Sequence, residues 1–268
     1  MIRKIYYKVR SILINPYKGL LSFSEYKRIR DMKRFEHGET NLFGSTIRFS
    51  DNYGFLCSLL EIFKDEQNKF TSTNPNPVVI DCGSNIGLSL IYFKRQFPNA
   101  DVTGFEPDDK IFGLLEQNVN SFGFKNVALN KAAIWNEDTQ LNFFSDGSLA
   151  GSLEIDLANK NVSNSVKAVR LKSLLQNKKI DFLKIDIEGA ESTVMFDIKE
   201  ELKNVKFFFL EYHSILGKEQ KFGEILEIIK SAGFRYYIKN HNDYLTHPFN
   251  EKAREGFDMQ LSIFCYRD

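Results

Sequence analysis

From residue 78 onward, short apolar runs alternate with longer segments whose apolar residues recur at helical spacing. The first unit is VVIDCGSNIGLSLIYFKRQF, where a strand pattern at 78–81 leads through a glycine turn into a helix expected over 86–97. Later strand patterns occupy 101–106, 126–134, 181–187 and 205–213, and later helical patterns occupy 109–122, 219–231 and a stretch from residue 190. Repeated alternation predicts an α/β fold with a mostly parallel sheet covered by helices.

The two ends of the chain depart from this alternation. Strand patterns at 234–239 and 259–267 follow each other without a helix, which predicts an antiparallel C-terminal pair at one edge of the sheet. Between 136 and 178 the pattern is less regular, with candidate strands at 140–144 and 166–171. Upstream, the expected elements are a helix over 22–35, a strand over 45–51, a helix over 54–65 and a proline-broken linker over 71–77.

These patterns divide the chain into three parts. We expect a small helical appendage, basic and amphipathic, over residues 1–40, a strand and helix lead-in with its linker over 41–77, and the main domain over 78–268.

Cysteine usage and hydropathy limit the class of protein. The three cysteines are far apart with no CxxC pair, so the sequence indicates neither a disulfide framework nor a thiolate zinc site, and a reducing compartment fits best. No apolar run approaches the length that spans a bilayer, and Lys8 and Arg10 interrupt the N-terminal apolar segment where a secretory core would lie. We expect a cytoplasmic protein.

Charge is concentrated at the N-terminus. Residues 1–35 contain ten Lys or Arg and two acidic residues, a net charge of +8 in a chain whose total is +1. Apolar residues recur there at helical spacing: Ile2, Ile5, Tyr6, Val9, Ile12 and Leu13. This helix either contacts an anionic surface, such as the inner face of a membrane, or packs on its own domain. Nucleic acid is not an expected partner, because no extended basic stripe follows.

Polar residues at the ends of the first two predicted strands indicate a ligand site. Ligands of parallel sheets bind beyond the carboxyl ends of the strands, where Asp81, Gly83 and Gly87 form a turn. Glu106 ends the next strand, about twenty residues after the glycines, where an acid can hold ribose hydroxyls. The pair predicts a ligand that contains adenosine.

The order of residues in the turn favours one such ligand. A dinucleotide loop reads GxGxxG, whereas this turn reads DxGxxxG and begins with the carboxylate of Asp81. A carboxylate suits a cation better than a pyrophosphate, and S-adenosylmethionine carries an ammonium and a sulfonium without any phosphate. A NAD-dependent oxidoreductase and a non-catalytic nucleoside-binding module are the alternatives.

Five blocks carry a resemblance to a known family: VVIDCGSNIGLS, VTGFEPDD, LNKAAI, FLKIDIEGAE and FFLEYH. In this order and at these separations, they resemble FkbM-type methyltransferases of the class I methyltransferase superfamily, over about residues 40 to 268. The resemblance implies a Rossmann-like fold, S-adenosylmethionine as cofactor and O-methylation of a hydroxyl on a small molecule or glycan, often a sugar hydroxyl of a polysaccharide, glycolipid or secondary metabolite.

The resemblance also implies positions for the cofactor. Gly83, Ser84, Asn85 and Gly87 would lie beside the methionine moiety, and Glu106 would bind the ribose. Residues 130–133, with Asn130 and Ala132 foremost, would lie near the adenine, although Ala132 and Ala133 serve equally for close packing of strand and helix. Asp81 either orders the turn or meets the ammonium of the cofactor through water.

An alcohol must lose its proton as the methyl group is transferred, and KIDIEGAE offers candidates for the base. Lys184 and Asp186 share a face of their strand by alternation, and Glu188 lies where the strand ends. Asp186 is the first choice of base, unless it only pairs with Lys184. Glu191 is expected to stabilise the first turn of the next helix.

FFLEYH places Glu211 and His213 on one face of a neighbouring strand. With Asp186 or Glu188 they form either a catalytic cluster, in which His213 could be the base, or a site for a hard divalent ion. A site without metal is favoured. The segment GSLAGSL, residues 147–153, either contacts substrate or is an ordinary flexible loop, and no role is expected for His37, His241 or His247.

Overall fold

The structure is a computed structural model that describes residues 15–144, 163–241, 247, 249–250 and 256–267. In chain order its elements are α2 (Phe23–Arg30), β1 (Gly38–Leu42), β2 (Ser45–Phe49), α3 (Asn52–Leu59), the π-helical η1 (Leu60–Lys64), β3 (Val78–Cys82), α4 (Leu88–Gln96), β4 (Asp101–Phe105), α5 (Asp109–Ser121), β5 (Val127–Asn130), β6 (Ala133–Trp135), β7 (Thr139–Phe144), β8 (Ser163–Arg170), α6 (Leu171–Leu175), β9 (Ile180–Ile185), α7 (Glu191–Ile198), the 3₁₀-helical η2 (Glu201–Asn204), β10 (Val205–Ile215), α8 (Phe222–Ser231), β11 (Arg235–Asn240) and β12 (Phe257–Tyr266).

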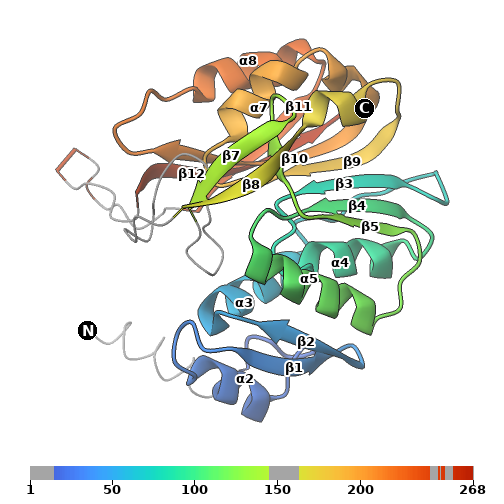
Figure 1. Ribbon diagram of the computed structural model, residues 1–268, viewed down its shortest axis with the longest axis vertical. Coiled ribbons are helices and arrows are strands. Elements are labelled where there is room, and N and C mark those ends of the chain that lie inside the picture. The colour runs from blue at the N-terminus through green and yellow to red at the C-terminus, as the bar shows by residue number, and fades with distance from the viewer. Residues whose placement is uncertain (1–14, 145–162, 242–246, 248, 251–255, 268) are drawn as a thin grey trace.

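A seven-stranded sheet in the order β11-β12-β10-β9-β3-β4-β5 forms the centre of the molecule. Strands β5, β4, β3, β9 and β10 pair in parallel, whereas β12 runs antiparallel to both β10 and β11. Helices α4 and α5 cover one face and α7 and α8 cover the other (Figure 1). The expected α/β fold, with a mainly parallel sheet and an antiparallel pair at one edge, is confirmed.

Alternation along the central strands separates the core into two clusters. Val79 and Phe182 pack on the side of α4 and α5, whereas their neighbours Ile80 and Leu183 pack on the side of α7 and α8. Successive side chains of a strand point to opposite faces, so each apolar run supplies both layers. The central strands are therefore buried on both faces, and the polar side chains of β3 and β9 gather toward their carboxyl ends.

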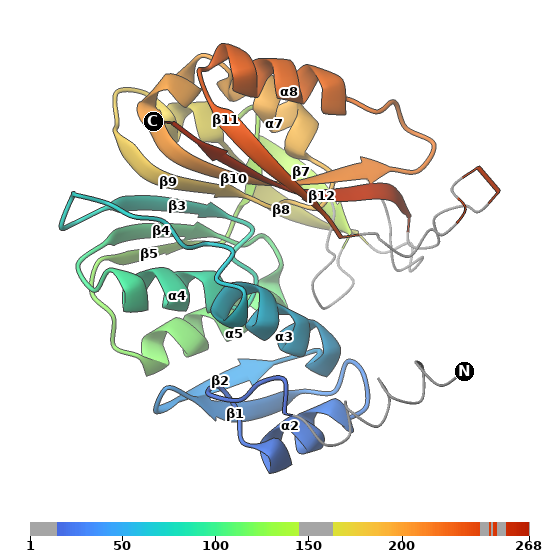
Figure 2. The same cartoon turned by 180° about the vertical axis from the view of Figure 1, so that it is seen from behind.

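The N-terminal segment is part of the first cluster. The antiparallel hairpin β1–β2 lies beside α5 and α3 (Figure 2), and Tyr17 and Ile29 are buried in the same cluster as Val79. Because β1 starts at Gly38, the expected boundary of the leader at residue 40 falls inside this hairpin. The predicted helix over 22–35 is also shorter, because α2 ends at Arg30. The apolar stripe of residues 2–13 lies outside the described residues.

One predicted strand was wrong in its extent. The pattern at 126–134 divides into β5, which joins the central sheet, and β6, which joins a separate sheet in the order β6-β8-β7. Ala132 N donates to Asn130 O at 3.0 Å, a tight turn that redirects the chain between the two sheets. The segment 147–153 lies outside the described residues. Within the described ranges, no helix has both the length and the apolar character needed to cross a bilayer.

Candidate active site

The turn after β3 is in backbone contact with the turn after β9. Gly83 has a φ of +84°, and a Cβ at this position would lie 1.8 Å from the carbonyl oxygen of Asp186. The N–H of Asp186 in turn donates to the carbonyl of Cys82 at 3.1 Å. Only glycine combines this left-handed conformation with so close an approach. The predicted cofactor turn and the predicted catalytic block therefore meet at one edge of the sheet.

Five successive N–H groups of the glycine turn are already bonded within the protein. They donate from Gly83 to Phe105 O, from Ser84 to Phe105 O, from Asn85 to Glu106 Oε2, from Ile86 to Asn85 Oδ1 and from Gly87 to Ser84 O. Dinucleotide loops use free backbone N–H groups to hold the pyrophosphate. These contacts therefore argue against the nicotinamide alternative.

Glu106 connects the glycine turn with the start of α5. Its Oε2 accepts from Asn85 N at 3.0 Å and its Oε1 accepts from Asp108 N at 2.9 Å. Burial raises the pKa of Glu106 to about 8, while the hydrogen bonds from Asp108 and Asn85 act in the opposite direction. Asp108 caps α5 by accepting from Lys110 N and Ile111 N. The carboxylate is thus fixed beside the turn at the end of β4.

Asp81 and Lys184 form a buried pair on β3 and β9. Lys184 Nζ lies 3.2 Å from Asp81 Oδ1 and 3.1 Å from Asp186 Oδ2, and donates to Gly83 O at 2.9 Å. Burial alone would lower the pKa of Lys184, but Asp186 and Asp81 raise it above its usual value. Ser89 Oγ donates to the other oxygen of Asp81. These contacts give Asp81 an ordering role, and they also pair Asp186 with Lys184.

The remaining expected cofactor residues take structural positions around the turn. Ser84 Oγ donates to Asp81 O at 3.1 Å and accepts from Phe105 N at 3.2 Å, so it joins β3 to β4. Gly87 has a φ of +91° and precedes α4. Asn130 ends β5, and its carbonyl accepts from Glu106 N at 3.1 Å.

The position of Ala132 agrees with the alternative that it serves close packing of strand and helix. Its side chain is 2% exposed, and it belongs to the cluster on the side of α7 and α8.

His213 lies at the centre of a group of acids. Its ring Nδ1 is 3.1 Å from Glu191 Oε1, and its Nε2 is 3.4 Å from Glu188 Oε2 and 3.8 Å from Glu211 Oε1. Burial alone would lower the pKa of His213, but Glu188 and Glu191 raise it well above its usual range. Burial raises the pKa of Glu188 well above its ordinary value and also raises that of Glu211. The four residues share a negative, largely dry environment.

The structure adds three residues that the sequence analysis did not place in the site. Glu191 is fully buried and contacts His213 in addition to beginning α7. Gln260 on β12 donates to Glu211 Oε1 at 2.6 Å. Burial and the nearby Glu211 raise the pKa of Glu61 on η1 to about 7. No local pattern announces Gln260 or Glu61, because the strand order and the N-terminal packing bring them in from distant parts of the chain.

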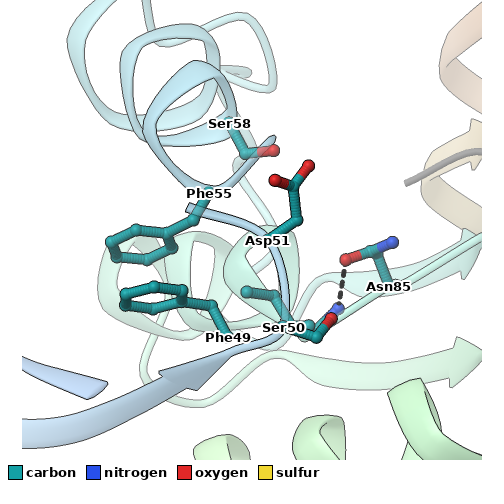
Figure 3. A pocket seen from close by; sticks show the side chains of 7 residues that line it. Phe49, Ser50, Asp51, Phe55, Ser58 and Asn85 are labelled. Atoms are coloured by element: carbon teal, nitrogen blue, oxygen red, sulfur yellow. Dashed lines mark hydrogen bonds between the residues drawn. The ribbon is translucent and has the colours of Figure 1, made fainter. Parts of the chain in front are cut away.

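Residues of the N-terminal segment line a hollow beside the glycine turn. It is lined by Ser50, Asp51, Phe55 and Asn85 among others (Figure 3). Asp51 caps α3 and lies 2.6 Å from an Arg34 nitrogen, so the wall of the hollow is held in place by residues upstream of the main domain. The dashed line of Figure 3 is the bond from Ile86 N to Asn85 Oδ1.

All expected site residues therefore lie at or next to the carboxyl ends of β3, β4, β5, β9 and β10. The sheet order places β9 between β3 and β10, so Asp186 is the link between the glycine turn and the acids around His213. One side of the site offers a buried acid beside a tight turn. The other offers carboxylates and an imidazole that can accept protons or hold a cation.

Comparison with solved structures finds matches of low identity. An FkbM methyltransferase from Methylobacillus flagellatus is 14% identical with a TM-score of 0.46, and the match covers 72% of this chain and 45% of that chain. A SAM-dependent methyltransferase from Agrobacterium tumefaciens is 12% identical with a TM-score of 0.48, over 87% of this chain and 71% of that chain.

Curated proteins give closer sequence matches. Methyltransferase sdnD of Sordaria araneosa is 26% identical over 175 residues, covering 53% of this chain and 68% of its own length. The 2-O-methyltransferase NoeI of Sinorhizobium fredii is 26% identical over 157 residues, covering 52% of this chain and 64% of its own length. The chain thus spans about two thirds of the length of these relatives. The family profile described as "Methyltransferase FkbM domain" matches residues 81–236. Because this match spans more than half of the sequence, the chain is a methyltransferase of the FkbM family.

Proposed function

We propose that this protein transfers a methyl group from S-adenosylmethionine to a hydroxyl oxygen, with a sugar in a glycan, glycolipid or secondary metabolite as acceptor. One observation carries the proposal: the glycine turn after β3 touches the backbone of Asp186, and the carboxylate of Asp186 lies close to Glu211 and His213. The positions proposed for the cofactor and for proton removal are thus adjacent.

The residues of the turn fit the cofactor in charge and in shape. Acids dominate this edge of the sheet, as a ligand with an ammonium and a sulfonium requires, and the left-handed Gly83 and Gly87 allow the turn to pack closely against Asp186 and Leu115. Gly83, Asn85 and Gly87 would hold the methionine moiety, and Glu106 would bind the ribose hydroxyls. When bound, S-adenosylmethionine supplies an electrophilic methyl group.

Asp186 fits the role of proton acceptor better than His213 does. The Asp186 side chain is 26% exposed, whereas that of His213 is fully buried. The Nδ1 of His213 also contacts Glu191, whereas Asp186 lies against the glycine turn. Orientation of the acceptor oxygen toward Asp186 would supply much of the acceleration, with proton removal adding roughly a hundredfold or more.

The acceptor class rests on the family resemblance and on one relative. The name of NoeI describes a 2-O-methyltransferase, which favours a hydroxyl over a nitrogen or carbon acceptor. Carboxylates near the reacting oxygen are consistent with this choice, because they can take the proton that an alcohol must release.

Cofactor and chemistry can be tested separately on the full chain. Calorimetry should show binding of S-adenosylmethionine and no binding of NAD, and methyl-labelled cofactor should label hydroxyl-bearing glycans. Asp186→Asn should keep the affinity for the cofactor and lose at least about a hundredfold in rate, whereas Asp109→Asn, an exposed acid paired with Lys131, should change neither. Binding of NAD instead, or transfer by Asp186→Asn at the wild-type rate, would contradict the proposal.

A further inference from the structure

Three side chains at the ends of β9 and β10 meet in the arrangement of a metal site. Asp186, Glu211 and His213 each offer one ligand atom, and these atoms all lie within 4.8 Å of one another. The parallel register pairs Leu210 with Ile185, so the residues that follow on each strand are neighbours. Two carboxylate oxygens and one imidazole nitrogen are ligands that divalent first-row ions accept. The geometry is set by the sheet and needs no loop to close.

The imidazole of His213 is oriented as a metal ligand would be. Its Nδ1 donates to Glu191, because a carboxylate can only accept, and Nε2 then points toward Glu188 and Glu211. Within the described part of the chain, Nε2 has no hydrogen-bond partner, although the side chain is completely buried. A buried polar atom without a hydrogen bond is unfavourable. A cation among these ligands would satisfy it.

Glu191 matches the outer partner that metal-binding histidines usually have. Such histidines donate the second ring nitrogen to a carboxylate, which fixes the ring and its tautomer. Glu191 is held in turn by the N–H groups of Ile187 at 3.1 Å and Gly189 at 3.0 Å. Gln260 similarly orients Glu211 by donating to its Oε1 at 2.6 Å.

Glu188 places a further carboxyl group beside the three ligands, because its Oε2 lies 3.4 Å from His213 Nε2. The Asp186 side chain is partly exposed, which leaves a route for an ion and for an acceptor oxygen.

We propose that Asp186, Glu211 and His213 bind one divalent cation, with Glu191 as the positioning residue. Imidazole beside two carboxylates favours Mn²⁺ or a similar transition ion over Ca²⁺. The role of the cation rests on the proposed function: it would hold the acceptor hydroxyl beside the glycine turn, with one carboxylate oxygen of Asp186 as a ligand and the other as the acceptor of the hydroxyl proton. The sequence favours a site without metal, whereas the side-chain geometry favours one with metal.

The test measures binding of Mn²⁺ alone to the full chain after dialysis against EDTA. Calorimetry and the EPR signal of free Mn²⁺ should give one ion per chain, and thermal unfolding should shift to higher temperature with Mn²⁺. His213→Gln and Glu211→Gln should each weaken binding at least about tenfold, and Glu191→Gln about tenfold. The control Asp109→Asn should bind as the wild type does.

The wild-type protein decides the outcome even where a variant does not fold. Absence of Mn²⁺ binding and of any thermal shift in the wild type would overturn the proposal, as would unchanged affinity in folded His213→Gln. Because no methyl donor or acceptor is present, the result is independent of the proposed function. That function would fail separately, if calorimetry showed no binding of S-adenosylmethionine.

Discussion

Glu191 Oε1 lies 3.1 Å from His213 Nδ1, and the same carboxylate accepts from the N–H groups of Ile187 and Gly189. One fully buried side chain therefore fixes both the imidazole on β10 and the loop that leaves β9. The loop needs such support, because Glu188 and Gly189 adopt φ values of +54° and +106°.

Replacing Glu191 should consequently disturb stability and site together. Glu191→Ala leaves a buried His213 without its partner and frees two loop N–H groups, so we expect unfolding to become easier by about 3 to 5 kcal/mol. Chemical denaturation measures this loss. Glu200→Ala, which removes an exposed acid just after α7, serves as the control. A loss below about 1 kcal/mol would mean that the loop and His213 hold their positions without Glu191.

Two glycines offer a matched pair of substitutions. Gly83→Ala places a methyl group 1.8 Å from Asp186 O in a left-handed conformation, so the turns after β3 and β9 must separate. We expect loss of cofactor binding by calorimetry and a fall in thermal stability. Gly113→Ala, inside α5 with no atom within 4 Å of the new methyl group, should be neutral or stabilise by up to about 1 kcal/mol. Normal cofactor affinity in Gly83→Ala would contradict the assigned contact.

Lys184 should be far more important than a surface lysine. Lys184→Met leaves the fully buried Asp81 without its cation, and we expect a loss of about 3 to 5 kcal/mol in urea unfolding. Lys131→Met removes an exposed pair with Asp109, for which we expect less than about 1 kcal/mol. If the two substitutions lowered the free energy of unfolding equally, the buried pair of Asp81 and Lys184 would contribute no more to stability than the exposed pair.

The acids of the site give stability a pH dependence. Burial raises the pKa of Glu61 to about 7 and that of Glu106 to about 8, so between pH 4.5 and 8 the folded chain binds more protons than the unfolded chain. The free energy of unfolding should therefore fall as pH rises through this window, measured in EDTA.

Glu61→Gln should remove part of this slope, up to about 3 kcal/mol between pH 4 and 8, because glutamine cannot ionise. Glu66→Gln serves as the control, since that acid is half-exposed and its pKa is lowered by Lys69. If the free energy of unfolding of Glu61→Gln depended on pH as strongly as that of the wild type, groups other than Glu61 would cause the pH dependence.

Contact of the basic N-terminus with an anionic membrane also remains a proposal, and the structure changes its test. Deleting residues 1–35 would remove Tyr17 and Ile29 from the core, so substitution of Arg3, Lys4, Lys8 and Arg10 by Gln is the better variant. We expect the wild type to float with anionic liposomes and the variant to float less. Arg28 and Arg30 of α2 and Arg34 after it already pair with acids, which makes residues 28–34 weaker as a second contact. Equal flotation would contradict the proposal.

Local patterns predicted the central sheet well because its strands are buried on both faces. Apolar runs such as 78–81 and 205–213 needed no tertiary information to be recognised as strands, and they end in the site residues. The pattern at 126–134 predicted one strand where the structure has two. Asn130 and Ala132 form a turn inside this apolar stretch, and the hydrogen bond from Ala132 N to Asn130 O that closes it does not change the spacing of apolar residues. The short strand β1, with Glu39 and Asn41 exposed on one face, lacks the strong β-forming side chains that would have announced it.

The site was predictable where its residues end consecutive strands. Asp81, Glu106 and Asp186 belong to this group. Glu61 and Gln260 do not, because they reach Glu211 only through the packing of η1 and through the position of β12 between β10 and β11. The alternation of side chains along a strand also could not show that Glu191 contacts His213. An acid that begins a helix has the same sequence pattern whether it is exposed or is the buried partner of a histidine.

The pairing of β3 with β9 has a kinetic consequence. It joins segments about a hundred residues apart, as in the bond from Lys184 to Gly83 across 101 positions, and it forms the middle of the sheet. Closing so long a loop costs conformational entropy and slows folding, because the stabilising contacts between β3 and β9 form only after the two segments have met. Refolding from denaturant should therefore pass through a state with local βα units but no cofactor turn, and the ability to bind a methyl donor should return in the slowest phase.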